Sequence, residues 1–222
     1  MKDRTANASG TARREPLTIA VPKGRLHDSV RALFGECGLQ FSFERRKLVA
    51  EDGTGRVRLM LVKNSDVPVY VNHGIAGLGI CGDDVLYEYG FDYYRLMTLP
   101  FGSTRMCLAG RRDHNPDQDH GRLRVATKFT RFAHDFFHDR GIPVEVIRLG
   151  GSVELAPVLG LAPYIVDLVE TGSTLEANDL VVTEELAQIS VHLIANPAYY
   201  KFRYQQVEEL LGILNGEQGA ER

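Results

Sequence analysis

The chain has 222 residues, of which 44% are hydrophobic and 25% are charged, and its formal net charge is −3. This composition is ordinary for a globular protein and argues against an intrinsically disordered chain, a fibrous repeat and a small disulfide-framed protein. The small negative charge supplies no overall positive field that would attract nucleic acid or an anionic membrane. The length fits either one large domain or two small ones.

The cysteines and the N-terminal residues indicate a protein of the cytoplasm. Cys37, Cys81 and Cys107 lie far apart in apolar segments, which is typical of unpaired core thiols rather than of a metal or redox site. Residues 1–16 are predicted to form a mobile tail, and they lack the apolar run of a signal peptide. No stretch approaches the roughly 18 consecutive apolar residues of a membrane span. We therefore predict a cytoplasmic protein with neither a membrane nor a nucleic acid as partner.

Short apolar runs alternate with amphipathic runs along the chain. The run 17–21 predicts a buried strand, and apolar residues then recur at helical spacing from Leu26 to Cys37, before a stop at Gly38. Further strands are predicted at 57–62, 78–81, 106–109, 124–127, 144–149, 165–169 and 191–195, and helices from residue 66 and over 84–88, 129–139, 152–159 and 199–214. Residues 111–121 predict a hairpin or loop. The alternation predicts an α/β protein with a mostly parallel sheet.

Two features favour two α/β lobes over one sheet. A break rich in proline and glycine follows Met97, and a new series of strand–helix units runs from there to about Thr183. We predict that residues 17–98 together with 185–222 form lobe I and that residues 99–184 form lobe II. If the final strand and helix return to lobe I, a cleft lies between the lobes.

The most informative segment runs from Tyr164 to Leu175. An apolar strand ends in the turn Thr171-Gly172-Ser173-Thr174, and a helix is predicted to follow. Backbone N–H groups of such a turn form a natural phosphate cradle. Asp167 and Glu170 stand just before it, where carboxylates suit the hydroxyls of a sugar phosphate or a bound Mg²⁺. The alternative is a helix-capping turn beside a surface acid.

Two other loops follow predicted strands, at the carboxyl ends where ligands of α/β sheets collect. In the first loop, Lys23 and Arg25 flank Gly24, an arrangement that suits a diphosphate but is equally typical of a solvated loop. The second loop contains Gly151, Ser152 and Glu154, and its alternative is a tight turn that caps a helix.

His134 and His138 superficially resemble a zinc-protease motif. At about 100° per residue they fall on the face of the predicted helix opposite its phenylalanines. The residue between them, Asp135, is also shorter than the glutamate of that motif. We therefore predict that both histidines lie on the surface and bind no metal.

Several motifs stand in the order found in one enzyme family. They are residues 21–26, 65–71, 78–82, 99–102, 124–128, 151–157, 167–175 and 196–197. Through them the chain, from about Leu17 to Lys201, resembles the short form of ATP phosphoribosyltransferase. The resemblance implies a fold like that of the type II periplasmic binding proteins, with two α/β lobes and an active-site cleft between them.

The resemblance also implies a reaction and a role for each candidate residue. Members of the family join N1 of the adenine of ATP to C1 of 5-phosphoribosyl pyrophosphate (PRPP), expel pyrophosphate and require Mg²⁺. In this chain, the turn 171–174 is implied to hold the 5-phosphate, and Asp167 and Glu170 to face the ribose hydroxyls. The implied cations for pyrophosphate are Lys23, Arg25, Arg46 and Lys63. Mg²⁺ is expected to be held mainly by substrate oxygens and water, so we predict no protein ligand for it.

The chain departs from the family pattern at two positions. Asp83 stands where a lysine is often found, so the cationic contact expected from that lysine is in doubt here. Lys63 stands where arginine is frequent, and lysine keeps the charge but loses the bidentate fork. We therefore expect a weaker or differently placed contact with the leaving group from Lys63.

The resemblance further implies partners. Short forms assemble with a separate regulatory subunit that resembles the catalytic part of histidyl-tRNA synthetase, so we predict a homodimer that also enters a hetero-oligomer. Two alternatives remain at the level of sequence: a non-catalytic module of the same fold that binds a small anion, and a phosphoribosyltransferase that uses another base as acceptor.

Overall fold

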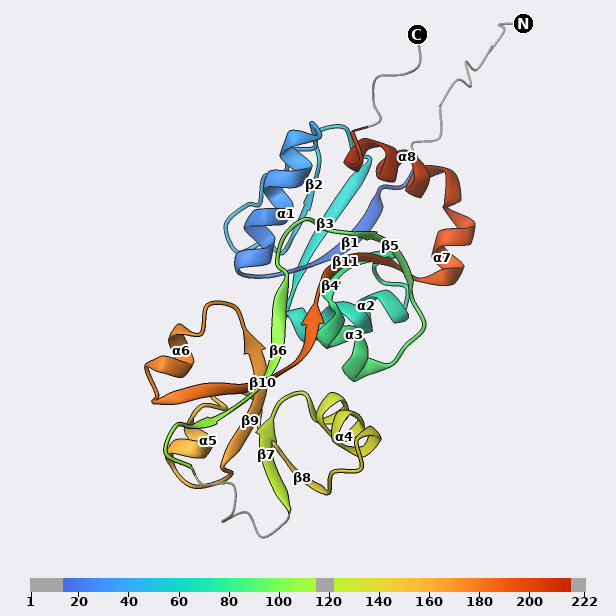
Figure 1. Cartoon of the computed structure of the whole chain (residues 1–222). Coiled ribbons are helices and arrows are strands. Elements are labelled where there is room, and N and C mark those ends of the chain that lie inside the picture. Colours follow the sequence, from blue (N-terminus) through green and yellow to red (C-terminus); the bar gives the residue numbers. More distant parts are fainter. Residues whose placement is uncertain (1–13, 115–121, 217–222) are drawn as a thin grey trace, which may run out of the picture.

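The computed structural model describes residues 14–114 and 122–216, which form two β-sheets with helices on their faces (Figure 1). We refer to each sheet and the helices packed on it as a lobe. The predicted tail falls largely outside the described residues, as does the predicted loop 111–121 from residue 115 onward. Cys81 and Cys107 are buried, Cys37 is half-buried, and all are free thiols, as predicted.

The first lobe is built on six strands. Their order in the sheet is β2 (Val49–Glu51), β3 (Val57–Val62), β1 (Leu17–Pro22), β4 (Leu78–Gly82), β11 (Val191–Ala195) and β5 (Tyr94–Thr98). Its helices are α1 (Arg25–Glu36), α2 (Val67–Asn72) after the 3-10 turn η1 (Asn64–Asp66), α3 (Asp83–Tyr89), α7 (Pro197–Phe202) and α8 (Tyr204–Leu214). Because side chains alternate along a strand, Ile19 packs with Phe34 of α1 and Val207 of α8, whereas Ala20 packs with Val67 of α2.

The second lobe is built on five strands. Their order is β10 (Leu180–Ile189), β6 (Thr104–Arg111), β9 (Tyr164–Val169), β7 (Leu123–Thr127) and β8 (Val144–Arg148). Its helices are α4 (Thr130–Asp139), α5 (Leu155–Val158) and α6 (Ser173–Glu176). Helix α4 packs its Phe137 on one face of this sheet, and α5 and α6 pack Ala156 and Leu175 on the other. His134 and His138 are exposed, as predicted.

The prediction of a mostly parallel sheet was wrong. Strands β1, β3 and β4 pair in parallel, as do β7, β8 and β9, but β2, β5, β6, β10 and β11 pair in antiparallel fashion. Strands β2, β5 and β10 were not predicted at all. Most of their side chains are exposed or half-buried, so these strands lack the apolar runs from which the other strands were inferred.

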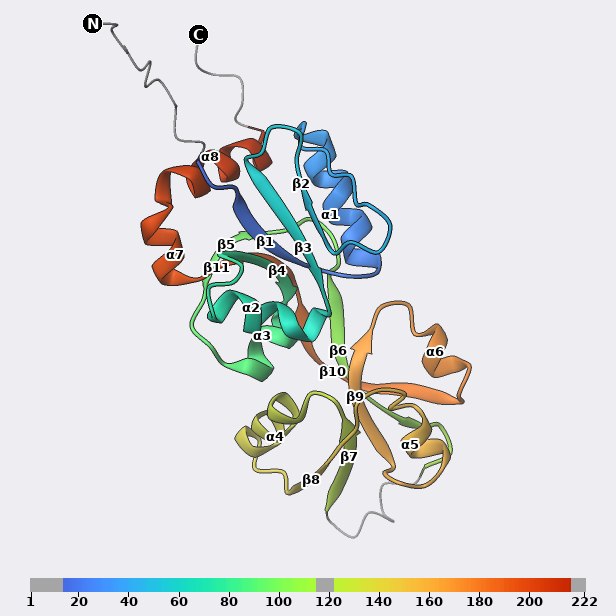
Figure 2. The same cartoon turned by 180° about the vertical axis from the view of Figure 1, so that it is seen from behind.

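The chain crosses between the lobes twice, and the two crossings lie side by side (Figures 1 and 2). Leu99 N donates to Val191 O over 2.8 Å, and Ser103 Oγ donates to Ile189 O over 3.2 Å. Strand β10 stays in the second sheet as far as Ile189, so the lobe boundary predicted at residue 184 falls inside it. Strand β11 then returns to the first sheet between β4 and β5.

The end of the described chain differs in detail from the prediction. The closing helix expected over 199–214 is two helices, α7 and α8, which are separated at Arg203, where φ is −112°. Asn196 caps α7 by accepting hydrogen bonds from the amides of Ala198 and Tyr199. Among the helices of the described residues, none is long and apolar enough to cross a membrane.

Candidate active site

The loop after β1 presents cations beside the end of a parallel strand. Strands β1 and β3 are in register, with Pro22 opposite Val62, so Lys23 and Lys63 both follow the same edge of the first sheet. Lys23, Arg25 and Lys63 are exposed. Gly24 has φ +92° and precedes the first residue of α1, a conformation that side-chain-bearing residues rarely adopt. The predicted loop is therefore formed, with the cationic side chains of Lys23 and Arg25 on its surface.

The loop after β9 forms the turn predicted from the sequence. Gly172 has φ +87° and precedes α6. Thr171 Oγ1 lies 3.1 Å from Ser173 Oγ, and Thr171, Ser173 and Thr174 are exposed. An exposed turn of hydroxyls around a left-handed glycine has the donors that a phosphate requires.

The loop after β8 lies in the same row of strand ends, because β9, β7 and β8 are neighbours in the second sheet. Gly151 and Ser152 are exposed, and Ser152 has φ +48°. Left-handed backbone at a residue other than glycine is uncommon and concentrates at functional sites. Helix α5 is shorter than the predicted 152–159 and begins after Glu154, which is half-buried.

Two of the predicted site residues meet although they belong to different lobes. Arg25 Nη1 donates to Glu170 Oε2 over 2.5 Å, and their side chains are 87% and 57% exposed. The loops after β1 and β9 therefore face each other across the junction of the lobes. In this arrangement the pair neutralises itself, so a substrate has to separate the two side chains before it can contact them.

Asp167 has a partner that sequence reasoning missed. Lys128 Nζ lies 3.3 Å from Asp167 Oδ1. The signal is present in the strand register, since Thr127 pairs with Val166 and the next residues on the two strands are Lys128 and Asp167. That pairing of β7 with β9 could not be deduced before the sheet order was known.

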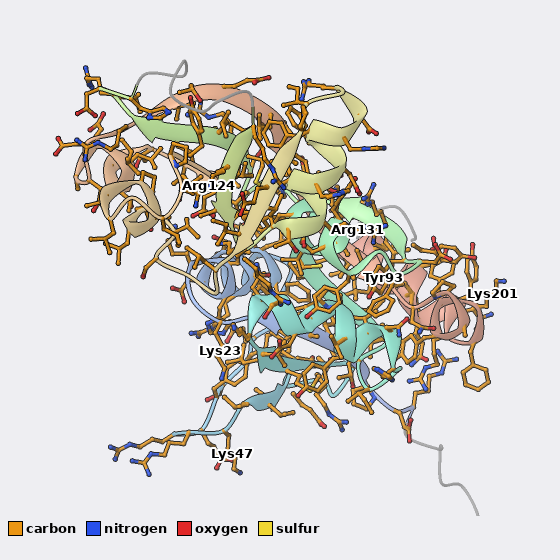
Figure 3. All side chains as sticks on the ribbon, turned by 90° about the horizontal axis from the view of Figure 1, so that it is seen from below. Lys23, Lys47, Tyr93, Arg124, Arg131 and Lys201 are labelled. Atoms are coloured by element: carbon orange, nitrogen blue, oxygen red, sulfur yellow. The ribbon has the colours of Figure 1, made fainter. Side chains whose placement is uncertain are left out.

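Arg46 lies in the run that leads into β2, at the end of the first sheet where β3 ends before Lys63. It lies in an exposed turn before β2, with φ +67°. Its neighbour Lys47 pairs with Glu44 over 2.7 Å and projects from the outer edge of the first lobe in Figure 3. Within the described part of the chain, no hydrogen bond or ion pair joins Arg46 to the other candidate residues.

A sizeable cavity of the protein is not part of this group of loops. It has a volume of about 680 Å³ and lies beside β5, at the edge of the first sheet. Its lining includes Tyr87, Phe91, Tyr94 and Tyr200, and none of the candidate residues contributes to it. We therefore place the site on the strand-end loops rather than in this cavity.

Comparison with known proteins gives one family. A model of the family described as ATP phosphoribosyltransferase matches residues 63–216. The chain is 46% identical over 200 residues to the ATP phosphoribosyltransferase of Thermoanaerobacter pseudethanolicus, with 89% of this chain and 93% of the relative covered. It is 46% identical over 188 residues to that of Streptococcus thermophilus, with 83% and 87% covered. The chain belongs to the ATP phosphoribosyltransferase family.

Solved structures agree with this membership. The ATP phosphoribosyl transferase (HisG:HisZ) complex from Thermotoga maritima contains a chain that superposes with a TM-score of 0.79 at 35% identity, covering 90% of this chain and 97% of that one. The alkanesulfonate-binding protein SsuA from Xanthomonas axonopodis pv. citri superposes with a TM-score of 0.60 at 15% identity, covering 92% and 74%. The second likeness concerns the fold alone. The predicted two-lobed α/β binding-protein fold is confirmed.

The structure explains one departure from the ATP phosphoribosyltransferase pattern. Asp83 Oδ2 accepts a hydrogen bond from Ser190 N over 3.0 Å, and Asp83 Oδ1 lies 3.0 Å from His192 Nε2 and 3.3 Å from an Arg95 nitrogen. The carboxylate thus joins the start of α3 to the second crossing between the lobes. At this position the chain uses an acid to support the crossing.

The two carboxylates expected to face the ribose each lie beside a cation of the protein. Asp167 already lies beside Lys128, and Glu170 beside Arg25, so a cation bound directly to either would be repelled by a neighbouring positive charge. Among the described residues, no group of three or more His, Cys, Asp or Glu side chains has metal-binding geometry.

Proposed function

We propose that the chain transfers the phosphoribosyl group of PRPP to N1 of ATP, the first step of histidine biosynthesis, and releases pyrophosphate. The observation that carries this proposal is the meeting of Arg25 and Glu170, which brings a cationic loop against a phosphate-type turn that carries carboxylates. The bond from N1 to C1 forms as the bond from C1 to the pyrophosphate oxygen breaks, and its electron pair leaves with pyrophosphate.

The proposed roles follow from charge and position. The turn 171–174 binds the 5-phosphate through its hydroxyls and backbone amides. Asp167 and Glu170 face the ribose hydroxyls, where negative charge also stabilises the positive charge that develops on the ring. The pyrophosphate gains negative charge as it leaves, and the residues proposed to neutralise that charge are Lys23, Arg25 and Lys63.

The remaining candidates support these contacts. Gly24 lets the backbone approach the pyrophosphate closely. Gly151, Ser152 and Glu154, in the loop after β8, contact the substrate from the far side of β7. Arg46, whose turn precedes β2 at the same end of the first sheet as Lys63, is proposed to contact pyrophosphate from there. Much of the rate acceleration then comes from holding ATP and PRPP in line for the displacement at C1.

In this proposal, PRPP carries Mg²⁺ into the site on its pyrophosphate group. A pyrophosphate group binds Mg²⁺ through its own oxygens, and the ion usually keeps several waters. The chain's contribution is to leave the pyrophosphate accessible on the side of Lys23 and Arg25, while Asp167 remains paired with Lys128.

We further propose a homodimer that assembles with a regulatory subunit in the cytoplasm. The support for the regulatory subunit is the HisG:HisZ complex of Thermotoga maritima, whose matching chain is 35% identical to this one.

The test is a turnover assay with the purified chain, ATP, PRPP and MgCl₂, followed through pyrophosphate release and through the absorbance of the new nucleotide. Turnover with ATP as the preferred acceptor is the expected result. No turnover, with and without the regulatory subunit, would overturn the proposal in favour of a non-catalytic anion-binding module. Faster turnover with another base in place of ATP would assign a different phosphoribosyltransferase.

A further inference from the structure

Lys128 is held at the centre of the row of strand ends in the second lobe. It follows the last residue of β7, the strand that lies between β9 and β8. Its Nζ lies 3.3 Å from Asp167 Oδ1 and 4.8 Å from the centroid of the Phe129 ring. The side chain is 44% exposed, whereas that of Asp167 is 19% exposed. The ammonium group therefore reaches solvent beside a carboxylate that is mostly covered.

Asp167 depends on this lysine. Its Oδ1 is buried and accepts no hydrogen bond from any described residue, and it forms an ion pair with Lys128. A buried charged oxygen without a hydrogen bond is costly unless an opposite charge stands close by. Without the ammonium group, we expect the carboxylate to turn toward solvent.

The backbone around Lys128 is fixed from its own lobe. The Thr127 side chain is fully buried, and its Oγ1 donates to Val166 O over 2.6 Å and accepts from Phe129 N over 2.9 Å. These bonds tie the residues on both sides of Lys128 to β9, the strand that carries Asp167. The backbone on both sides of the lysine is thus held beside the strand that carries Asp167.

The same segment is also fixed from the other lobe. Helix α4 begins two residues after Lys128 and has no side-chain cap of its own. Instead, Glu88 of α3 accepts hydrogen bonds from Phe132 N over 2.8 Å and from Arg131 N over 3.2 Å. Figure 3 shows Arg131 where α4 meets the first lobe. A carboxylate at a helix N-terminus satisfies amides that would otherwise lack a partner.

The positive charge of Lys128 also acts on a buried acid of the first lobe. Asp84 is 5% exposed, and burial raises the pKa of its carboxyl, while the positive charge of Lys128 acts in the opposite direction. Lys128 is therefore a cation that acts on carboxyls of both lobes.

We propose that Lys128 is a positioning residue of the phosphoribosyl site, which holds the Asp167 carboxylate turned toward the ribose hydroxyls of PRPP. This inference rests on the proposed function. Lys128 acts through Asp167 and not through ATP, so its loss should impair the use of PRPP and leave the use of ATP nearly unchanged.

The test measures kcat and the KM of each substrate for Lys128→Met and Lys128→Arg. Lys128→Met removes the charge but keeps an unbranched side chain, and we expect kcat/KM for PRPP to fall about 10- to 100-fold, as for other residues that orient a ligand-binding side chain. The KM for ATP should stay within about threefold. Lys128→Arg should recover most of the loss. The matched control is Lys201→Met, on α7 at the far edge of the first lobe (Figure 3), which should behave as the wild type.

A double-mutant cycle with Asp167→Asn separates positioning from a general structural effect. If Lys128 acts through Asp167, Lys128→Met should add less than about threefold to the loss already caused by Asp167→Asn. Wild-type kinetics of Lys128→Met, equal rises in both KM values, or fully additive losses would overturn the inference. If thermal unfolding shows that Lys128→Met is not folded, the same kinetic measurements are made on Lys128→Gln. Absence of turnover by the wild-type chain would instead overturn the proposed function and this inference with it.

Discussion

Arg25 and Glu170 join the two lobes through one ion pair, in which Arg25 Nη1 lies 2.5 Å from Glu170 Oε2. Both side chains are largely exposed, and exposed pairs contribute only about 0–1 kcal/mol to stability. Both residues also belong to the loops proposed to bind PRPP. The pair is therefore weak enough for a substrate to replace, with pyrophosphate taking Arg25 and the ribose taking Glu170.

The variant Glu170→Gln should separate catalysis from stability. We expect kcat to fall about 100-fold or more, because the amide has no charge to stabilise the positive ribose ring. The free energy of unfolding should change by less than about 1 kcal/mol, since the pair is exposed. Steady-state kinetics and urea denaturation measure the two effects. The control is Glu184→Gln, whose carboxylate pairs with Arg140 on the surface over 3.7 Å and should leave kinetics unchanged. Wild-type turnover of Glu170→Gln would remove Glu170 from the site.

The variant Gly172→Ala should weaken PRPP binding through the backbone alone. A Cβ at Gly172 would meet nothing closer than Val169 Cγ1 at 3.9 Å, so no steric clash is expected. The φ of +87° is nevertheless unfavourable for alanine, by about 1–2 kcal/mol, and the turn should relax away from its phosphate-binding shape. We expect the KM for PRPP to rise about tenfold in steady-state assays.

Gly35→Ala is the matched control for that backbone effect. Gly35 lies within α1, and a Cβ there would meet no atom within 4 Å. Alanine in a helix should stabilise the fold by about 0.5–1 kcal/mol without changing the KM for PRPP. Equal kinetic effects in both glycine variants would show that the conformation of the 171–174 turn does not matter for binding.

Strands whose side chains are mostly buried could be predicted from the sequence. Strands β1, β4, β9 and β11 have mostly buried side chains, and their apolar runs marked them correctly. Strand β10 carries exposed polar residues from Thr183 to Glu185, so its pattern resembled a loop.

In the candidate site, a group of residues within one segment could be predicted, but contacts between residues distant in the sequence could not. The glycines and hydroxyls of the turn 171–174 act within one short segment, so their grouping was visible in the sequence. The pairing of Lys128 with Asp167 depends on β7 lying beside β9, and that of Arg25 with Glu170 depends on how the lobes meet. Contacts that arise from strand order or lobe placement have no local signal in the sequence.

The variant Asp83→Ala should destabilise the crossing between the lobes. Removal of the carboxylate takes away the hydrogen-bond acceptor of Ser190 N and the partner of His192 Nε2, and His192 is only 8% exposed. Loss of such partners costs about 1–3 kcal/mol, which urea denaturation should detect. Asp113→Ala, which removes an exposed partner of Arg111, should leave stability unchanged. An unaltered denaturation midpoint for Asp83→Ala would contradict the role of Asp83 at the crossing.

The carboxylate of Asp52 should make the stability of the first lobe depend on pH. Burial of Asp52 opposes its charged form, but hydrogen bonds from the Thr54 side chain and from the amides of Val57 and Thr54 outweigh burial and lower its pKa. A folded-state pKa below the unfolded value of about 3.9 means that the ionised group stabilises the fold above that value. The stabilisation is lost as pH falls through the lower, folded-state pKa.

Asp52→Asn tests this linkage. At pH 7 the variant should be less stable than the wild type by about 1–3 kcal/mol, because the amide cannot accept all the hydrogen bonds that the carboxylate accepts. Because only the wild type has a carboxylate at position 52 that can be protonated, the gap between the two urea denaturation curves should narrow once the pH falls below about 4. A gap that stays constant from pH 7 to about pH 3 would show that hydrogen-bond geometry, and not the ionised state of Asp52, provides the stabilisation.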